Sequence, residues 1–383
     1  KNAALPLAGR AALYYNGGNF LPLEGDGMEE YDIIIVGGGP AGATLARLLP
    51  EHLRVLLLCD DRRGKPCGGL LAPDAQKALA RFDLTLPKEI LVDPQIFAVR
   101  TIDLTSRQQR YYQRMYINVD RVKFDRWLLD MVPPHVSVRH VRCRSVERRE
   151  DGFLATFPGQ DGALETARAA VLVGADGAGS LVRRSLFGPI KTRQYTAIQQ
   201  WFPLAAVNPF YSCVFDPATS PCCSWSICKD NFFIFGGAFP SRGSRAVFEA
   251  QKQRLADYLH MDFGAPVKTE ACQVLRPSRP ASFCLGGGGA YLVGEAAGFI
   301  SPSSLEGISS AILSATALAE SLESARPLAA YRRATKHLRW KLLAKNLKCP
   351  FMYHPFLRSL VLKSGLTSIQ VEARPRGTPE AKM

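Results

Sequence analysis

The sequence lacks several features that define other classes of protein. No uninterrupted apolar run reaches the ~20 residues that a membrane-spanning helix needs. No Cys-x-x-Cys pair is present, and the six histidines are scattered rather than spaced as metal ligands. Aromatic residues do not alternate with basic ones as they do in nucleic-acid-binding modules. We therefore expect neither a metal site nor a nucleic-acid partner.

Acidic residues are also absent from a long stretch near the C-terminus. The net charge is +14, and residues 326–363 hold ten Lys and Arg and no Asp or Glu. We predict basic helices here, with Tyr331 and Leu342 on one face and Arg332 and Lys336 on another. Two interpretations stay open: a solvated face that covers the core, or contact with an anionic membrane surface or an acidic partner.

The first clear motif is YDIIIVGGGPAG at residues 31–42. Residues 33–36 form a β-branched run that is typical of a strand buried in a parallel sheet. Gly37, Gly39 and Gly42 follow in the G-x-G-x-x-G spacing, before a helical segment. These glycines permit a tight turn, close approach of a pyrophosphate, and close packing of the helix on the strand. The motif predicts a dinucleotide-binding turn whose phosphates meet the helix N-terminus.

A second buried strand, residues 54–58, ends beside two candidate acids. A dinucleotide-binding fold places an acid at this strand end, about 20 residues past the glycines, to hold ribose hydroxyls. Cys59 stands at the usual position, and Asp60 follows it. We assign the role to Asp60. The alternative is that Asp60 and Asp61 form a solvated turn.

Two further glycine turns follow buried strands. The run AAVLVGADG ends in residues 174–177, where Asp176 is placed to reach into a cofactor cleft. The strand YLV leads into the turn at 294–298. Gly307 then starts a helix of small residues at 308–322, whose N-terminus can meet a phosphate or a flavin edge.

Together, the three turns resemble the FAD-binding fold of the flavoprotein monooxygenase and geranylgeranyl reductase superfamily. GGGPAG resembles its adenine-dinucleotide motif, GADGAGSLVRR its second motif, and GEAAGFISPSSLEGISSAI its flavin-ribityl motif, with Glu295 in the acid position. KPCGG at 65–69 is similar to an element of the geranylgeranyl reductase branch, and Trp225 and Lys229 match part of another signature of that branch.

The resemblance implies an α/β fold with a Rossmann-like FAD-binding domain of the glutathione reductase type, an inserted antiparallel β-sheet substrate domain, and a C-terminal helical segment. It implies FAD as the cofactor. The electron donor is then NAD(P)H at a transient docking site or another protein, because no separate NAD(P)H-binding unit is visible. The implied cofactor-binding residues are Gly37, Gly39, Pro40, Ala41, Gly42, Asp60, Arg121, Asp176, Gly177, Gly294, Glu295, Gly307 and Ile308.

The local composition and strand pattern of the sequence predict how the chain is divided into domains. Residues 1–27 read as a flexible N-terminal extension. Stretches with buried strands and glycine turns alternate with stretches rich in aromatic residues and short alternating strands. We assign 28–85, 116–190 and 285–325 to the FAD-binding domain, 86–115 and 191–284 to the substrate domain, and 326–383 to a basic helical region.

Cys67 is the leading candidate for catalysis. The resemblance motivates a thiol that lines the pocket and donates a proton or a hydrogen bond, and the alternative is a small packing residue. Gly68 and Gly69 allow the backbone to approach a flat molecule closely, and we place both glycines in the substrate pocket. Trp225 is predicted as pocket wall or core.

Three functions follow from this pattern. The first is a geranylgeranyl-reductase-like enzyme that reduces double bonds of an apolar or aromatic small molecule by hydride transfer from reduced flavin. The second is an FAD-dependent monooxygenase. The third is a non-catalytic flavin-binding protein that docks to a membrane through its basic helices. Ten cysteines beside a nucleotide-binding motif predict reduced thiols and a cytoplasmic location, with peripheral membrane contact as an option.

Overall fold

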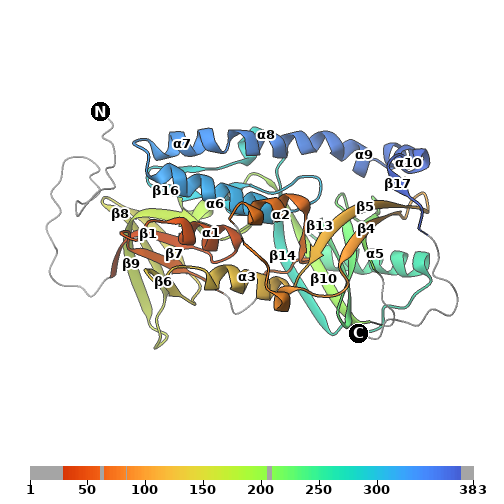
Figure 1. Ribbon diagram of the computed structural model, residues 1–383, viewed down its shortest axis with the longest axis horizontal. Coiled ribbons are helices and arrows are strands. Elements are labelled where there is room, and N and C mark those ends of the chain that lie inside the picture. The colour runs from red at the N-terminus through yellow and green to blue at the C-terminus, as the bar shows by residue number, and fades with distance from the viewer. Residues whose placement is uncertain (1–28, 61–63, 83, 205–208, 372–383) are drawn as a thin grey trace. The chain divides into compact units, whose positions relative to one another are not determined.

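Two units alternate along the chain, and each is formed from three separate stretches of sequence. The computed structural model describes residues 29–60, 64–82, 84–204 and 209–371, so the predicted N-terminal extension lies outside it. Figure 1 labels the elements. The first unit comprises Lys1–Gly64, Phe124–Arg193 and Leu275–Ala344, and the second comprises Lys65–Lys123, Gln194–Val274 and Lys345–Met383.

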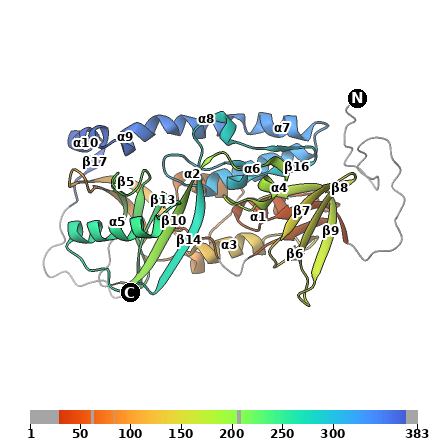
Figure 2. The ribbon, with the colours of Figure 1, turned by 180° about the vertical axis from the view of Figure 1, so that it is seen from behind.

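The first unit is built on an eight-stranded sheet with a parallel centre. Its main order is β15-β16-β9-β1-β2-β6, and β8 pairs antiparallel with β9 and with β7. Figure 2 shows β7, β8 and β9 from behind. The apolar end of β1 is fully buried, as expected for a central parallel strand. The strands are β1 (Glu29–Val36), β2 (Val55–Leu58), β6 (Val136–Arg139), β7 (Ser145–Arg149), β8 (Gly152–Pro158), β9 (Leu164–Gly174), β15 (Gly286–Gly287) and β16 (Ala290–Leu292).

Small residues allow the helices of this unit to pack closely. α6 (Ile308–Leu322) contacts both α1 (Pro40–Leu48) and α7 (Pro327–Ala334), and Figure 1 shows the three helices. Tyr331 of α7 is fully buried, and its hydroxyl donates to the carbonyl oxygen of Leu292 at 2.9 Å. The first of the basic helices is therefore fixed to β16 of the sheet. The remaining helices are α3 (Arg121–Asp130), which starts in the second unit, α4 (Leu181–Phe187) and α8 (Lys336–Ala344).

The second unit is built on a nine-stranded, mostly antiparallel sheet. Its order is β14-β10-β13-β12-β11-β4-β5-β17, with β3 paired to β5 and a parallel pairing between β11 and β4. The strands are β3 (Leu70–Leu71), β4 (Ile96–Asp103), β5 (Gln108–Asn118), β10 (Arg193–Pro203), β11 (Phe210–Phe215), β12 (Ser224–Lys229), β13 (Phe232–Pro240), β14 (Lys268–Arg276) and β17 (Ser368–Ile369). Its helices include α2 (Pro73–Ala80), α5 (Ser244–Leu259), α9 (Cys349–Tyr353) and α10 (Pro355–Ser364).

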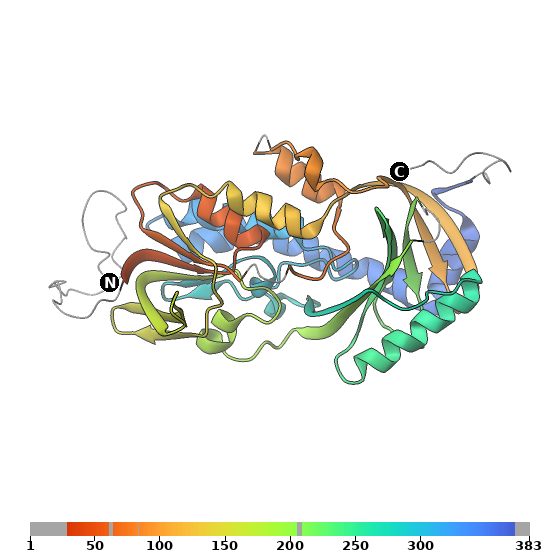
Figure 3. The same cartoon turned by 90° about the horizontal axis from the view of Figure 1, so that it is seen from below.

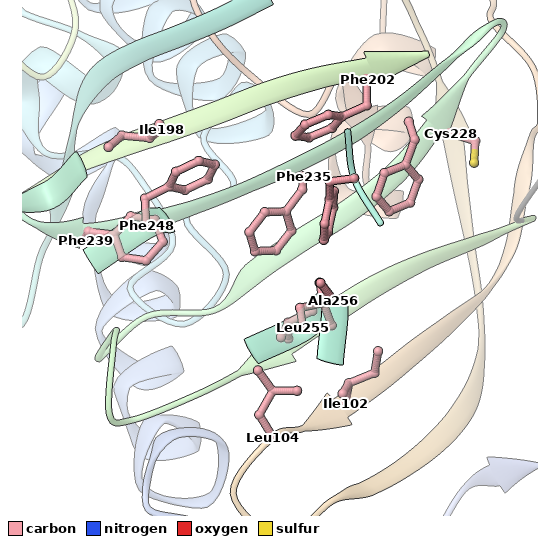
Figure 4. Packing of buried hydrophobic residues seen from close by; sticks show 13 residues of the cluster. Ile102, Leu104, Ile198, Phe202, Cys228, Phe235, Phe239, Phe248, Leu255 and Ala256 are labelled. Atoms are coloured by element: carbon pink, nitrogen blue, oxygen red, sulfur yellow. The ribbon is translucent and has the colours of Figure 1, made fainter. Parts of the chain in front are cut away.

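Aromatic side chains fill the core between this sheet and α5. Figure 3 shows α5 lying along the strands. Figure 4 shows Phe248 of α5 beside Phe235 and Phe239 of β13. The Phe235 and Phe248 rings stack with centroids 5.5 Å apart, and all three residues are fully buried. Burial of such rings stabilises the sheet by about 1.5–3 kcal/mol for each side chain.

A buried ion pair attaches α10 to the second sheet. The guanidinium of Arg358 lies 3.0 Å from the carboxylate of Asp103, and both side chains are almost completely buried. Burial alone would raise the pKa of Asp103, but hydrogen bonding to Arg358 outweighs it and lowers that pKa. Loss of either partner would leave a buried charge uncompensated, so the pair holds α10 in one orientation.

The predicted α/β class with an added antiparallel sheet and a helical C-terminal segment is confirmed, but the division of the chain differs from the prediction. Residues 65–85 and 116–123 were expected in the FAD-binding domain and belong to the second unit. The cause is the pairing of β3 with β5, which places Leu70 opposite Asn118. The basic region 326–383 is not a separate part either, because it divides between α8 and the turn of helix that follows it.

Candidate functional site

The three glycine turns start from aligned strand ends in the first unit. β1, β9 and β16 run parallel, so their carboxyl ends lie at one edge of the sheet. The register pairs Val36 with both Leu58 and Gly174, and Gly174 with Leu292. Strand order runs outward in both directions from β1, and open α/β sheets bind ligands at such a switch point.

Two glycines of the first turn are required by protein packing, and the third is not. Gly37 has φ +107°, a conformation that side chains rarely adopt, and an added Cβ would lie 2.6 Å from the carbonyl oxygen of Ala175. At Gly42 an added Cβ would lie 1.8 Å from the carbonyl oxygen of Gly37. At Gly39 no heavy atom lies within 4 Å of such a Cβ. The open space at Gly39 fits the predicted approach of a pyrophosphate.

The N-terminus of α1 is suited to an anion. Gly39 precedes the helix in extended backbone without a side-chain cap, and the first turn contains no acid. Pro40, Ala41 and Gly42 form that first turn and are buried. The first N–H groups of a helix have no intrahelical partner, and the helix dipole favours negative charge there. The turn can therefore bind phosphate oxygens through backbone donors.

The end of the second strand separates two neighbouring residues. Cys59 is buried, and its Sγ would lie 2.2 Å from a Cβ added at Gly38. The residue at the usual acid position thus packs under the glycine turn. Asp60 is exposed, so its carboxylate is accessible to a ribose, and its role there stays a prediction. Asp61 lies outside the described residues.

Asp176 in the second turn is half-buried, and only one of its two carboxylate oxygens has well-formed hydrogen bonds. Its Oδ2 accepts from the backbone N–H groups of Leu181 at 2.6 Å and Val182 at 3.2 Å. Its Oδ1 is buried and accepts no hydrogen bond of good geometry from the described residues. Burial raises the pKa of Asp176, although hydrogen bonding to Ser180 and the backbone opposes this. A hydroxyl donor at Oδ1 would complete the group.

A buried arginine joins the second turn to the third. Arg183 of α4 donates to the carbonyl oxygens of Ala296 at 3.0 Å and Ser282 at 3.3 Å. Burial lowers the pKa of its guanidinium. Gly177 has φ +75° with no heavy atom within 4 Å of an added Cβ, so its surroundings are as open as those of Gly39. Arg183 fixes the distance between two of the three turns.

The third turn is a short 3₁₀ helix, Gly294–Ala297, that is completely buried. Gly294 has φ +58°, and its N–H donates to Ser314 Oγ at 2.9 Å. Glu295 is 9% exposed, and its Oε1 accepts from the N–H of Leu275 at 2.9 Å. One oxygen of this carboxylate therefore bonds to the protein backbone. Contact of the other carboxylate oxygen of Glu295 with a ribityl hydroxyl stays a prediction.

Gly307 and Ile308 form the predicted second helix N-terminus. Gly307 is the N-cap of α6, without a side-chain cap and without an acid in the first turn. Both residues are half-buried. Their backbone can serve an anion or a flavin edge as at α1. Arg121, the remaining predicted cofactor residue, begins α3 within the second unit, and its role stays a prediction.

The Cys67 loop belongs to the second unit. The thiol of Cys67 accepts a hydrogen bond from the N–H of Gly69 at 3.4 Å, and the side chain is half-buried. Gly69 has φ +63°, and an added Cβ would lie 2.4 Å from the carbonyl oxygen of Val119. A Cβ at Gly68 would meet Ile227 Cδ1 at 3.0 Å. Gly69 is therefore needed for this loop to approach the sheet, whereas a side chain at Gly68 would require Ile227 to shift.

A buried lysine, which our sequence analysis gave no site role, holds the Cys67 loop. The three protons of an ammonium match three acceptors around Lys229 Nζ: Asn118 Oδ1 at 2.6 Å, Val119 O at 2.7 Å and Gly69 O at 3.4 Å. Burial lowers the pKa of Lys229 to about 8, although the nearby Cys67 and two aspartates oppose this. The lysine stays mainly charged at neutral pH.

Asn118 extends this network to a second loop. Its side-chain amide donates to Pro94 O and Cys228 O, each at 3.0 Å. Its backbone N–H donates to Gln95 Oε1 at 2.9 Å. Every polar atom of the Asn118 side chain is thereby bonded, which is the requirement for burying it. The sequence signal for this cluster is only the position of Lys229 at the end of the Trp225 stretch.

Trp225 packs against glycines on two sides. A Cβ added at Gly236 would lie 2.7 Å from the indole Nε1, so the ring covers that glycine. The indole also lies beside Gly68, where an added Cβ would be 3.7 Å from Nε1. The Nε1 donor is buried without a hydrogen-bond partner among the described residues. The structure thus brings Trp225 and Gly68 together, and their role in a substrate pocket stays a prediction. Among the described residues no cluster of His, Cys, Asp or Glu could hold a metal ion.

Comparisons with known proteins give close relatives in sequence and distant ones in structure. No family model matches the chain. Protein CbrA of Escherichia coli O6:H1 is 45% identical over 351 residues, which cover 89% of this chain and 95% of that protein. Protein CbrA of Shigella sonnei is also 45% identical, over 89% of this chain and 99% of its own length.

Solved structures share the fold at low sequence identity. A geranylgeranyl bacteriochlorophyll reductase-like protein from Thermoplasma acidophilum has a TM-score of 0.72 at 19% identity, covering 88% of this chain and 91% of its own. PqsL of Pseudomonas aeruginosa, a probable FAD-dependent monooxygenase, has a TM-score of 0.64 at 20% identity, and the match covers 88% of this chain and 100% of PqsL. The p-nitrophenol 4-monooxygenase PnpA of Pseudomonas putida has a TM-score of 0.66 at 17% identity, and the match covers 88% of this chain and 94% of PnpA. The chain therefore shares the fold of these three proteins, as the resemblance implied.

Proposed function

The chain belongs to the CbrA family, and from this premise and its fold we propose that it is an FAD-dependent oxidoreductase. One observation carries the proposal: three glycine turns leave a parallel sheet from strand ends paired in register at the switch point. Such an edge suits an extended dinucleotide better than a small ligand, because three backbone segments contribute to it.

The residues at this edge fit FAD. Open space at Gly39 and Gly177 leaves room for phosphate and sugar to approach the backbone. The uncapped N-terminus of α1 supplies N–H donors for a pyrophosphate. The Oδ1 of Asp176, which has no hydrogen bond of good geometry among the described residues, suits a hydroxyl of the cofactor rather than a phosphate, because like charges repel. Asp60 and Glu295 would accept further hydroxyl donors.

The second unit would supply the substrate side. When bound, the flavin supplies hydride chemistry, and the chain must position the substrate and deliver protons. We assign the Cys67 thiol to the donation of a proton or a hydrogen bond to the substrate. Lys229 keeps the Cys67 loop in place through Gly69. Trp225 and Gly68 would form an apolar wall, which favours a small apolar or aromatic substrate.

Within this class we propose a reductase of double bonds in an apolar substrate. The Cys67-Gly68-Gly69 element favours it, because KPCGG at 65–69 resembles an element of the geranylgeranyl reductase branch. An FAD-dependent monooxygenase is the second candidate, and the fold shared with PqsL and PnpA favours it. A flavin-binding protein without turnover is the third. NAD(P)H and a protein donor are both candidates for the electron source.

The test is anaerobic turnover of the full-length protein. Flavin released from the purified protein is first identified as FAD. The bound flavin is then reduced chemically without oxygen, and its reoxidation is followed with unsaturated polyprenyl alcohols or diphosphates as probes. Reoxidation under these conditions, with a saturated product, supports the reductase. Product formation only with oxygen supports the monooxygenase, and absence of bound flavin would refute the proposal as a whole.

A further inference from the structure

Exposed apolar side chains concentrate at the C-terminal end of the second unit. Sixteen large apolar residues are exposed among the described residues, and eight of them lie between Leu347 and Val371. Single exposed apolar residues are normal, but contiguous groups mark sites of interaction. We call the following residues the C-terminal apolar surface: Leu347, Phe351, Phe356, Leu360, Val361 and Leu366.

α10 shows that the exposure results from a fixed orientation. Arg358 and Leu362 are 3% and 2% exposed and face the sheet of the second unit, where Arg358 pairs with Asp103. Phe356 and Leu360 are 64% and 49% exposed. Residues two positions apart in an α-helix point about 200° apart, so Phe356 and Leu360 lie opposite the buried pair. The helix cannot turn these side chains inward without breaking a buried ion pair.

The charged residues within the segment that carries this surface have one sign. Residues 345–371 contain four Lys and Arg and no Asp or Glu. Arg358 is neutralised by Asp103, and Lys345 lies 3.6 Å from Asp74. Lys348 and Lys363 are exposed beside the apolar residues. The combination of large apolar side chains and lysines is the composition of a helix that lies in a membrane interface.

We propose that the C-terminal apolar surface docks the protein on the surface of a lipid bilayer with anionic headgroups. The aromatic and aliphatic side chains would enter the boundary between headgroups and acyl chains, and Lys348 and Lys363 would contact phosphates. None of the helices described is long and apolar enough to cross a membrane. A second copy of the chain is a poorer occupant, because it would bring the same lysines together.

The proposal does not depend on flavin chemistry, and vesicle flotation tests it directly. The purified full-length protein is mixed with phosphatidylethanolamine vesicles that contain phosphatidylglycerol, and with phosphatidylcholine vesicles. We expect binding to the anionic vesicles that weakens at high salt. The double substitution F356E/L360E should lower that binding more than about tenfold. The matched control is Leu164→Glu, because Leu164 is 68% exposed in the first unit, and it should bind as the wild type does.

Two further variants keep the test decisive if F356E/L360E folds poorly. K348E/K363E changes only exposed side chains and should weaken binding to anionic vesicles alone. In the Phe356→Trp variant, brominated lipid in the anionic vesicles should quench the fluorescence of the new tryptophan. This quenching reports insertion of the side chain directly. Unchanged flotation of F356E/L360E, or absence of quenching, would overturn the proposal. A dimer in sedimentation that F356E/L360E dissociates, without vesicle binding, would also overturn it and assign the surface to a second copy.

Discussion

Lys229 in the second unit and Asp176 in the first both lie near glycine loops, and their hydrogen bonding differs. Lys229 in the second unit has three protons and three acceptors, so its bonds are complete within the chain. Asp176 in the first unit has one oxygen bonded twice and one oxygen without a good donor among the described residues. A group whose hydrogen bonds are all made within the chain stabilises the fold, whereas a group with an unused acceptor can still bind a ligand.

The glycines repeat this difference. Gly42 and Gly69 are required by atoms of the protein, because an added Cβ would meet a backbone oxygen at 1.8 Å and 2.4 Å. Gly39 and Gly177 have no neighbour within 4 Å of that position. Packing therefore explains the first pair but not the second. Gly177 has a backbone conformation with φ +75° that favours glycine, whereas Gly39 has neither a close neighbour nor a positive φ and is left to a ligand. The substitutions below test each side of this division.

The largest effect is expected at Gly42. Alanine there should lower the free energy of unfolding by about 3 kcal/mol or more, because its methyl group would overlap a backbone oxygen that cannot move away. Gly39→Ala is the matched control and should change that free energy by less than about 0.5 kcal/mol while weakening FAD binding more than tenfold. Chemical denaturation and flavin titration measure both. Equal destabilisation by the two variants would contradict the distinction between glycines required by packing and glycines that face a ligand.

Lys229 should give the second unit a characteristic pH dependence. Its pKa is lowered from 10.5 to about 8, so between these values the unfolded chain binds more protons than the folded one, and stability rises with pH. This contribution is on the order of 3 kcal/mol across the interval. We expect it in the wild type and in the exposed control Lys123→Met, and not in Lys229→Met. Denaturation curves from pH 8 to 10.5 measure it, and parallel curves for all three proteins would contradict the assignment.

Cys67 tests whether the loop that Lys229 holds is chemical. Cys67→Ala should slow substrate-dependent reoxidation of the flavin about a hundredfold, because a proton or hydrogen-bond donor is lost. Cys67→Ser should retain part of the rate. The half-buried Cys349 provides the control, and Cys349→Ser should turn over normally. Unchanged reoxidation rates in both Cys67 variants would show that this residue has a packing role and no chemical one.

Asp176 should give the smallest effect. Asp176→Asn keeps an acceptor for the N–H groups of Leu181 and Val182 but presents an amide donor where a cofactor hydroxyl needs an acceptor. FAD binding should weaken about tenfold, or about 1.4 kcal/mol. Isothermal titration of the apoprotein measures it, with the exposed Glu323→Gln as control. Affinity equal to that of the wild type would show that Oδ1 is completed by something other than FAD.

Local sequence signals predicted the first unit better than the second. A strand, a glycine turn and a helix follow one another within a dozen residues, so the turn at Gly37 was readable, as was the start of α6 at Gly307. The cluster around Lys229 was not readable, because Asn118 lies 111 residues away and no periodicity connects them. The ion pair of Arg358 with Asp103, 255 residues apart, was hidden for the same reason. Pairing of β3 with β5 likewise moved the Cys67 loop out of its predicted domain.

The contacts of Lys229 also set an order for biosynthesis. The ammonium bonds to Val119 and Gly69, which the ribosome produces 110 and 160 residues earlier. A chain that grows from its N-terminus must therefore carry the Cys67 loop without its anchor until β12 has emerged, and closing so long a loop is slow. The loop that we assign to catalysis gains its anchor only after β12 has been made, so a truncated chain that ends before Lys229 would contain Cys67 without the structure that positions it.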